Sequence, residues 1–252
     1  MRPAILPLLI AALPVLGGQP VLYQDGPTRL AGYVARPAAV TGTVPGILII
    51  HQWMGLTGHE RMEADRLAAL GYVALAADIY GEGVRPRDTA EAGAQATLYK
   101  GDRALYRRRL RAGLDALKAQ AGVDPGRLAV IGFCFGGTGA LEAARAGLPV
   151  KGVVSFHGGL DAPPDPAAPP ITAKVLVCHG ADDPNVPPKD VAAFQDEMRR
   201  RKGDYTFIAY AGAVHAFTQK EAGSDPARGA AYQEAAATRS WQHMKDFFAE
   251  LF

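Results

Sequence analysis

The sequence predicts a single α/β domain, in which a mostly parallel central sheet is covered by helices on both faces. Strand-like and helix-like segments alternate along the chain. Several strand-like segments, such as residues 46–50, are apolar throughout. Such strands are typical of a parallel sheet, because the helices that connect its strands bury both of its faces.

The individual elements follow from residue type and spacing. Runs rich in β-branched and aromatic residues predict strands over 20–24, 29–35, 46–51, 72–77, 128–131, 150–156, 174–178 and 205–210. Apolar residues at helical spacing predict helices over 58–70, 102–119, 136–146, 188–202 and 226–251. We expect 81–96 and 161–170 to be loops. The proline-rich 161–170 is too short to separate two domains.

Length and composition agree with one enzyme-sized domain. The 252 residues, 48% of them hydrophobic, can form a substantial core. The 27 basic and 25 acidic side chains nearly balance and give no reason to expect a nucleic-acid partner. We expect the local cluster of Arg107, Arg108, Arg109 and Arg111 to be a solvated helix face. The six histidines show no close ligand spacing with the two cysteines, so no metal or other cofactor is predicted.

Residues 128–137 predict a strand that leads into a tight turn with Cys134 at its tip. Gly132 and Gly136 flank the cysteine in a G-x-C-x-G pattern, the thiol counterpart of G-x-S-x-G. Small residues at these positions let a strand and a helix approach closely around a strained turn. The amides and dipole of the following helix would favour a thiolate. Cys134 is therefore a candidate nucleophile, and a buried structural cysteine is the alternative.

A thiol nucleophile needs a base and a group that orients the base, and later loops supply both. Asp182 and Asp183 follow the strand-like run 174–178, and His215 follows the run 205–210. The chain order of nucleophile, acid and histidine is that of the α/β-hydrolase fold. Loops that follow these strands can converge at one edge of the sheet.

Together with two earlier segments, these motifs give the chain a resemblance to the dienelactone hydrolase (carboxymethylenebutenolidase) family. The resemblance runs from about residue 32 to the C-terminus. It is carried in order by ILIIHQWMGL (47–56), ADIYGEG (77–83), GFCFGG (132–137), HGADD (179–183) and YAGAVHAF (210–217). Each motif alone is weak, but five in sequence are specific. The resemblance implies an α/β-hydrolase fold and hydrolysis of esters or lactones.

The resemblance also implies the roles of individual residues. It makes Cys134 the nucleophile, His215 the general base and then acid, and Asp183 the residue that orients His215. Asp183 is preferred to Asp182 because the family motif has its acid three residues after the glycine. Asp182 is expected to make a hydrogen bond within the turn.

An oxyanion hole and a pocket are expected next to these three residues. The amide of Phe135, directly after the nucleophile, should be one oxyanion donor, and similarity to the family points to the amide of Trp53 as the second. Tyr80, Trp53 and Phe135 are candidates to line the pocket, with a core role as the alternative. His51 is a further candidate to lie near the pocket, with a packing role as the alternative.

The chain departs from the family at two positions. The dienelactone enzymes carry a glutamate that holds the resting thiol where this chain has Gln52, and glutamine cannot take up a proton at ordinary pH. We therefore expect the pair of Cys134 and His215 alone to set the thiolate population. Gln219 stands where the family has an arginine that binds the substrate carboxylate. A small anionic lactone is therefore less expected as the substrate of this chain. Arg85 and Arg87 could supply charge instead, but exposed loop arginines are usually solvated.

The N-terminal residues 1–18 predict a signal peptide, which leaves 19–252 as the folded domain. Arg2 precedes an apolar stretch over 4–16 that is too short to span a membrane. Export to the periplasm or the medium is therefore expected, with a cytosolic N-terminal segment as the alternative. An oxidising compartment would permit a disulfide between Cys134 and Cys178. An intervening strand should keep the two beyond reach, because strands lie about 4.8 Å apart.

We expect a monomeric hydrolase that cleaves a carboxylic ester or lactone with water through an acyl-cysteine intermediate. One alternative is a general carboxylesterase for small acyl esters. The other is a non-catalytic binding or redox thiol protein on the same fold, with an alkylatable Cys134 but no turnover.

Overall fold

The computed structural model describes residues 15–39, 41–165 and 167–252, which contain one eight-stranded sheet in the order β1-β2-β4-β3-β5-β6-β7-β8. β1 (Val15–Asp25) and β2 (Thr28–Pro37) form an antiparallel hairpin, and β2 is antiparallel to β4 (Val73–Ala77). All other neighbours are parallel. The strands that run parallel to one another and to β4 are β3 (Val44–Ile50), β5 (Val123–Phe133), β6 (Gly152–Phe156), β7 (Lys174–Gly180) and β8 (Tyr205–Tyr210). The predicted mostly parallel sheet is confirmed.

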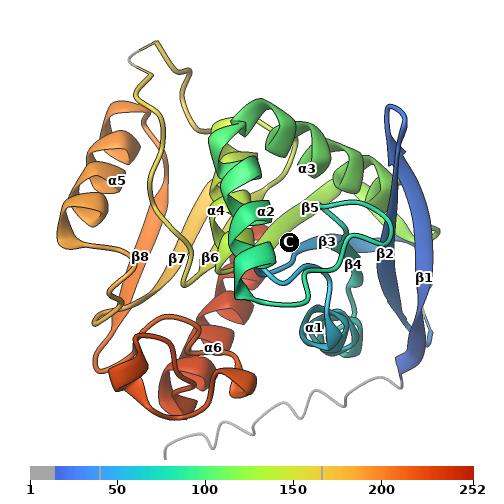
Figure 1. The fold of residues 1–252 in the computed structure, drawn as a ribbon. Coiled ribbons are helices and arrows are strands. Elements are labelled where there is room, and N and C mark those ends of the chain that lie inside the picture. Colours follow the sequence, from blue (N-terminus) through green and yellow to red (C-terminus); the bar gives the residue numbers. More distant parts are fainter. Residues whose placement is uncertain (1–14, 40, 166) are drawn as a thin grey trace, which may run out of the picture.

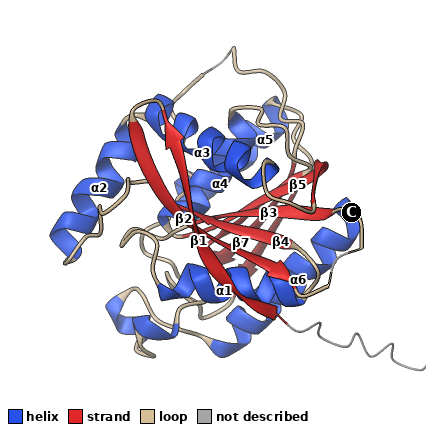
Figure 2. Ribbon diagram, turned by 90° about the vertical axis from the view of Figure 1, so that its right-hand side faces the viewer, coloured by secondary structure: helices blue, strands red, loops and turns tan. Residues whose placement is uncertain are grey.

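Helices cover both faces of the sheet (Figures 1 and 2). α1 (Gly58–Ala69) and α6 (Glu234–Leu251) lie on one face. α2 (Thr89–Gly101), α3 (Arg103–Lys118), α4 (Phe135–Arg145) and α5 (Pro188–Arg200) lie on the other. Each face has its own hydrophobic core. Leu48 of β3 packs in the cluster that includes Leu110 of α3, and the next residue, Ile49, packs in the cluster of Phe248 of α6, because successive side chains of a strand point to opposite faces.

Two predictions of secondary structure were wrong. Residues 81–96 were expected to be a loop, but α2 begins within them, after Asp88, whose side chain accepts a hydrogen bond from the Glu91 amide. Only Ala92 and Tyr99 of α2 are buried, so the sequence lacks an apolar stripe. The last helix starts at Glu234 rather than at residue 226. Its predicted first turn is a short 3₁₀ segment, Pro226–Arg228, that ends at Gly229 with φ 76°.

The basic cluster on α3 is also not the fully solvated face that was expected. Arg109 is buried, because the β1–β2 hairpin folds over α3 and brings Asp25 and Thr28 to the guanidinium group. Arg107 is partly buried and pairs with Glu142 of α4. Arg108 and Arg111 are exposed as predicted. A charged residue on a helix can therefore be buried when a distant segment supplies its counter-ion.

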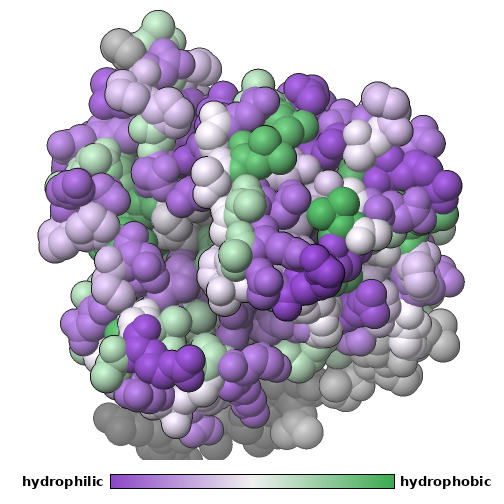
Figure 3. Space-filling view, in the orientation of Figure 1, coloured by the Kyte–Doolittle hydropathy of each residue, from purple (hydrophilic) through white to green (hydrophobic). Residues whose placement is uncertain are grey.

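The predicted signal peptide falls mostly outside the described residues. Residues 1–14 are among those not described, whereas 15–18 form the start of β1. Within the described ranges no helix has the length and hydrophobicity of a membrane span. The face of the molecule in Figure 3 is mainly hydrophilic, with small separate hydrophobic patches. Export and the monomeric state stay predictions.

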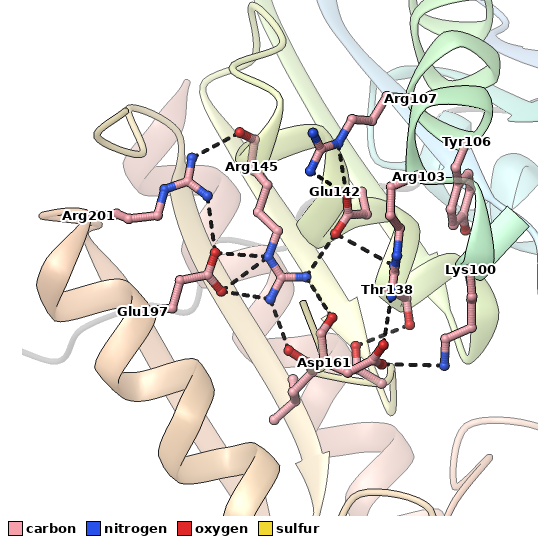
Figure 4. A network of polar contacts seen from close by, with 12 residues as sticks. Lys100, Arg103, Tyr106, Arg107, Thr138, Glu142, Arg145, Asp161, Glu197 and Arg201 are labelled. Atoms are coloured by element: carbon pink, nitrogen blue, oxygen red, sulfur yellow. Dashed lines mark hydrogen bonds and ion pairs between the residues drawn. The ribbon is translucent and has the colours of Figure 1, made fainter. Parts of the chain in front are cut away.

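A buried polar network ties α3, α4 and α5 to the loop after β6 (Figure 4). Arg145 of α4 lies between Glu142 and Glu197 and also donates to the carbonyls of Leu160 and Asp161. Its side chain is only 2% exposed. The network lines a cavity of about 740 Å³ away from Cys134. Glu142, Glu197 and Asp161 pair with four arginines of the cavity wall, Arg103, Arg107, Arg145 and Arg201, which suits a structural role.

The turn between β5 and α4 depends on two glycines. A Cβ added to Gly132 would lie 1.9 Å from the carbonyl oxygen of Gly136, and one added to Gly136 would lie 2.1 Å from the carbonyl oxygen of Ile50. Both contacts are with backbone, which cannot move aside as a flexible side chain can. The close approach of α4 to β3 and β5 therefore requires glycine at both positions. This is the steric requirement that the G-x-C-x-G pattern predicts.

Replacing Gly136 by alanine should destabilise the protein by about 3 kcal/mol or more, since the methyl group has no space. Gly93→Ala is the matched control, because Gly93 lies inside α2 with nothing within 4 Å of its added Cβ. That change should be neutral or stabilising by up to about 1 kcal/mol. Urea unfolding of both variants measures the difference. Equal stabilities would show that the turn does not need the close approach.

Removing the guanidinium group of Arg145 should also be costly. Arg145→Met leaves the buried carboxylates of Glu142 and Glu197 without a shared partner, and we expect a loss of about 3 to 5 kcal/mol. Arg199→Met on α5 is the control, because its ion pair with Asp196 is exposed and should contribute less than about 1 kcal/mol. Thermal or urea unfolding measures the stability of the two variants. An equally small loss of unfolding free energy in both would contradict this account.

Candidate active site

Cys134 stands at the tip of the turn between β5 and α4. Its φ of 55° and ψ of −115° lie in a region that residues with side chains rarely occupy. Its amide donates to the carbonyl of Phe156 at 3.0 Å and to Nδ1 of His157 at 3.2 Å. The thiol sits at the amino-terminal end of α4, where the helix dipole favours negative charge.

The structure brings His215 and Asp183 to this thiol. His215 Nε2 is 3.0 Å from Cys134 Sγ, and His215 Nδ1 is 2.8 Å from Asp183 Oδ2. The other carboxylate oxygen of Asp183 accepts from the amide of Asn185 at 2.9 Å. Asp183 is buried, whereas its neighbour Asp182 is exposed and its amide donates to the carbonyl of Ala213. A nucleophile, a base and an orienting acid require this linear chain of contacts.

The fold determines why these three residues meet. Asp183 follows β7 and His215 follows β8, and both strands run parallel to β5. The carboxyl ends of parallel strands lie at one edge of the sheet, so the three loops share that edge. The His215 loop is held from its other side by the segment before α6. The amide of His215 donates to the Gly229 carbonyl, and its own carbonyl accepts from Ala231.

The ionisation of Cys134 and His215 is mutually dependent. Burial raises the pKa of the Cys134 thiol, but the charge and hydrogen bond of His215, together with the backbone amides of Phe135 and Trp53, outweigh burial, so the net pKa is lowered. Burial likewise lowers the pKa of His215, but a thiolate at Cys134 and the Asp183 carboxylate raise it above its usual value. Both shifts favour a thiolate and imidazolium ion pair.

The amides of Phe135 and Trp53 both face the Cys134 sulfur, and each lowers the pKa of the thiol. Hydrogen bonds from two buried side chains hold the loop of Trp53 in place. Tyr80 donates its hydroxyl hydrogen to the Trp53 carbonyl at 2.9 Å. His51 Nδ1 is 2.7 Å from the Gln52 carbonyl, and His51 Nε2 accepts from the amide of Ile79 at 3.2 Å. Tyr80 and His51 are buried and hold the loop, next to the ring of Phe135.

Gln52, one of the two departures from the family motif, and the loop arginines Arg85 and Arg87 bring no unpaired charge to Cys134. Gln52 is buried, and its side-chain oxygen accepts from the Met54 amide at 2.8 Å. Arg85 donates to the carbonyls of Val84 and Gly81 and pairs with Asp78, and Arg87 is exposed and pairs with Glu91. Both arginines are therefore engaged elsewhere.

Sequence reasoning missed His157, which is fully buried beside Cys134. Its Nε2 lies 2.8 Å from Oγ1 of Thr218, a residue of the His215 loop. The only signal was a histidine directly after the apolar run that became β6. That position adjoins the Cys134 turn only because β6 is the sheet neighbour of β5. The order of strands in a sheet cannot be predicted from the local sequence.

Cys178, the second cysteine, is a poor nucleophile. It lies on β7, separated from β5 by β6, and it is fully buried. Burial raises its pKa to about 12, so it stays a thiol at neutral pH. Both cysteines are free. In the described part of the chain no group of three or more metal-binding side chains converges.

Comparison with known proteins gives this geometry a context. A model of the dienelactone hydrolase family matches residues 30–252. A putative carboxymethylenebutenolidase of Salmonella typhimurium is 30% identical over 233 residues, which cover 88% of this chain and 83% of the relative.

Two solved structures are similar over nearly their whole length. One, named m3DLH, has a TM-score of 0.89 and 42% identity over 93% of this chain and 98% of its own. The other is a dienelactone hydrolase-like promiscuous phosphotriesterase from metagenomic libraries, with a TM-score of 0.87 and 43% identity over the same shares. The chain therefore belongs to the dienelactone hydrolase family, whose members have the α/β-hydrolase fold and hydrolyse ester and lactone bonds.

Proposed function

We propose that this hydrolase cleaves a carboxylic ester or lactone by covalent catalysis, with Cys134 as nucleophile, His215 as base and acid, and Asp183 as the residue that orients His215. The observation that carries the proposal is the unbroken series of contacts from Asp183 through His215 to Cys134, of 2.8 and 3.0 Å. The paired pKa shifts support a resting thiolate next to an imidazolium.

In the acylation step the Cys134 thiolate attacks the carbonyl carbon of the substrate, and the carbonyl oxygen takes the negative charge. The amides of Phe135 and Trp53 face the sulfur and can donate to that oxyanion. When the intermediate collapses, the carbon–oxygen bond breaks and His215 gives its proton to the departing alkoxide. The product is a thioester on Cys134, and in a lactone the alcohol stays attached to the acyl chain.

In the deacylation step His215, now neutral, takes a proton from water, and the resulting hydroxide attacks the thioester. The second tetrahedral intermediate expels the Cys134 thiolate, and the ion pair with His215 is restored. Asp183 keeps His215 Nδ1 protonated, so that Nε2 faces the reaction. Gln52 takes no part in proton transfer, since its amide cannot ionise.

The substrate is proposed to be a small neutral ester or lactone. Gln219 has no charge with which to bind a carboxylate, and Arg85 and Arg87 pair with acidic residues. A second candidate is a phosphotriester, because a relative with 43% identity is a promiscuous phosphotriesterase. The Cys134 thiolate could also attack the phosphorus of an aryl phosphotriester and expel the aryloxide, which takes the proton of His215, while the two amides donate to the charged phosphoryl oxygen.

Steady-state hydrolysis of a short aryl ester, an enol lactone and an aryl phosphotriester tests these activities. Cys134→Ala should lower kcat/KM at least about a thousandfold for each compound that the wild type cleaves, since the nucleophile is lost. Cys178→Ala is the matched control and should keep activity. Wild-type turnover that survives in Cys134→Ala would exclude the proposed mechanism, and the ratio of the three rates would rank the substrates.

The pH dependence of Cys134 alkylation tests the ion pair separately. In His215→Ala the two largest contributions that lower the thiol pKa are lost while burial remains, so the midpoint of the alkylation profile should move to higher pH. A neutral alkylating reagent and peptide mapping measure the profile for Cys134 alone. His243→Ala, on α6, is the control and should leave the profile unchanged. Identical profiles in the wild type and His215→Ala would mean that His215 does not set the thiolate population.

A further inference from the structure

His157 connects the turn that carries Cys134 to the loop that carries His215. It directly follows β6, and its φ of 42° is in the left-handed region. One ring nitrogen, Nδ1, accepts a hydrogen bond from the Cys134 amide at 3.2 Å. The other, Nε2, is 2.8 Å from Oγ1 of Thr218, three residues after His215. A single buried imidazole thus joins the two segments whose side chains meet in the site.

The hydrogen-bond partners determine which ring nitrogen carries the proton. An amide donor at Nδ1 requires a lone pair there, so the proton lies on Nε2 and is donated to Thr218 Oγ1. Burial, and then repulsion from a charged His215, lower the pKa of His157 well below its usual value. The ring is therefore neutral and held in one tautomer. It adds no second positive charge beside the imidazolium of His215.

The Cys134 turn does not need His157 to satisfy its backbone. The Cys134 amide also donates to the Phe156 carbonyl at 3.0 Å, which is a sufficient partner. The backbone of the His215 loop is anchored on its far side by Gly229 and Ala231. On its near side the His157 ring packs against the rings of His215 and Phe217, with centroids 5.3 and 5.1 Å apart. What His157 contributes beyond these contacts is a direct link between the two loops.

We propose that His157 is a positioning residue, which fixes the distance between Cys134 Sγ and His215 Nε2 by bridging their loops through Thr218. The inference rests on the proposed function, because that distance matters only if the two groups react together. Proton transfer and attack are sensitive to small displacements of reacting groups, so loosening the bridge should slow the chemical steps more than substrate binding.

Two substitutions at Thr218 test the far end of the bridge without changing any residue next to the sulfur. Thr218→Val keeps the shape of the side chain but removes the acceptor for His157 Nε2. We expect kcat to fall roughly tenfold or more, with KM changed less than about twofold. Thr218→Ser keeps the hydroxyl group and should restore most of kcat. Thermal unfolding of both variants shows whether stability accounts for the change.

Two substitutions at His157 test the ring itself. Asparagine tolerates the left-handed backbone, and its Oδ1 can take the place of Nδ1 as acceptor for the Cys134 amide, but its side chain is too short to reach Thr218. His157→Asn should therefore match Thr218→Val in kcat, and the double variant should be no slower than either one, because both changes break the same link. His157→Leu loses both hydrogen bonds and should lower kcat at least as much as His157→Asn.

The outcomes separate this inference from the proposed function. If Cys134→Ala is inactive while Thr218→Val and His157→Asn keep wild-type kcat and lose only thermal stability, His157 is merely structural and the inference is wrong. Multiplicative losses in the double variant would also overturn it. If Cys134→Ala keeps its activity, the proposed function itself fails. Should His157→Leu not fold, the Thr218 pair still gives the answer.

Discussion

The close approach of α4 to the ends of β3 and β5 is the constraint on which the rest of the site depends. It is possible only because Gly132 and Gly136 have no side chain where backbone atoms would lie about 2 Å away. The approach forces Cys134 into a strained conformation and turns its thiol toward the loops that follow β7 and β8. It also brings the amide of Phe135, at the start of α4, next to the sulfur. The same close approach of α4 therefore produces both the backbone strain at Cys134 and the polar surroundings of its thiol.

The electrostatics of the site follow from burial combined with specific partners. Burial alone would keep Cys134 as a thiol, as it does for Cys178, whose pKa it raises to about 12. The difference between the two cysteines is the His215 imidazole, which Asp183 orients, together with two backbone amides. Two thiols of the same chain therefore differ in pKa, which is raised for Cys178 on β7 and lowered for Cys134 at the turn before α4. The contrast shows that position in the fold, rather than residue type, determines the ionisation of a cysteine.

Much of the fold could be predicted from the sequence. The apolar strands reflect burial on both faces of the sheet, and the glycine pattern reflects the close approach of two backbone segments. The helix α2 could not, since few of its residues are buried and periodicity therefore gives no signal. Arg109 was mistaken for a solvated residue because its partner Asp25 lies on a distant hairpin. The sequence motifs correctly indicated that Cys134, Asp183 and His215 lie together. His157 was missed because its neighbours are set by strand order, which depends on long-range pairing.

The central claim is that Cys134 carries the acyl group during turnover. Rapid acid quench before the first turnover is complete, with intact mass spectrometry and peptide mapping, tests it most directly. The substrate should be an aryl ester whose acyl group deacylates slowly. The account predicts a stoichiometric acyl adduct on Cys134 that forms as the aryl alcohol is released and then decays at the turnover rate. Release of the alcohol with Cys134 unmodified, or an adduct on another residue, would contradict it.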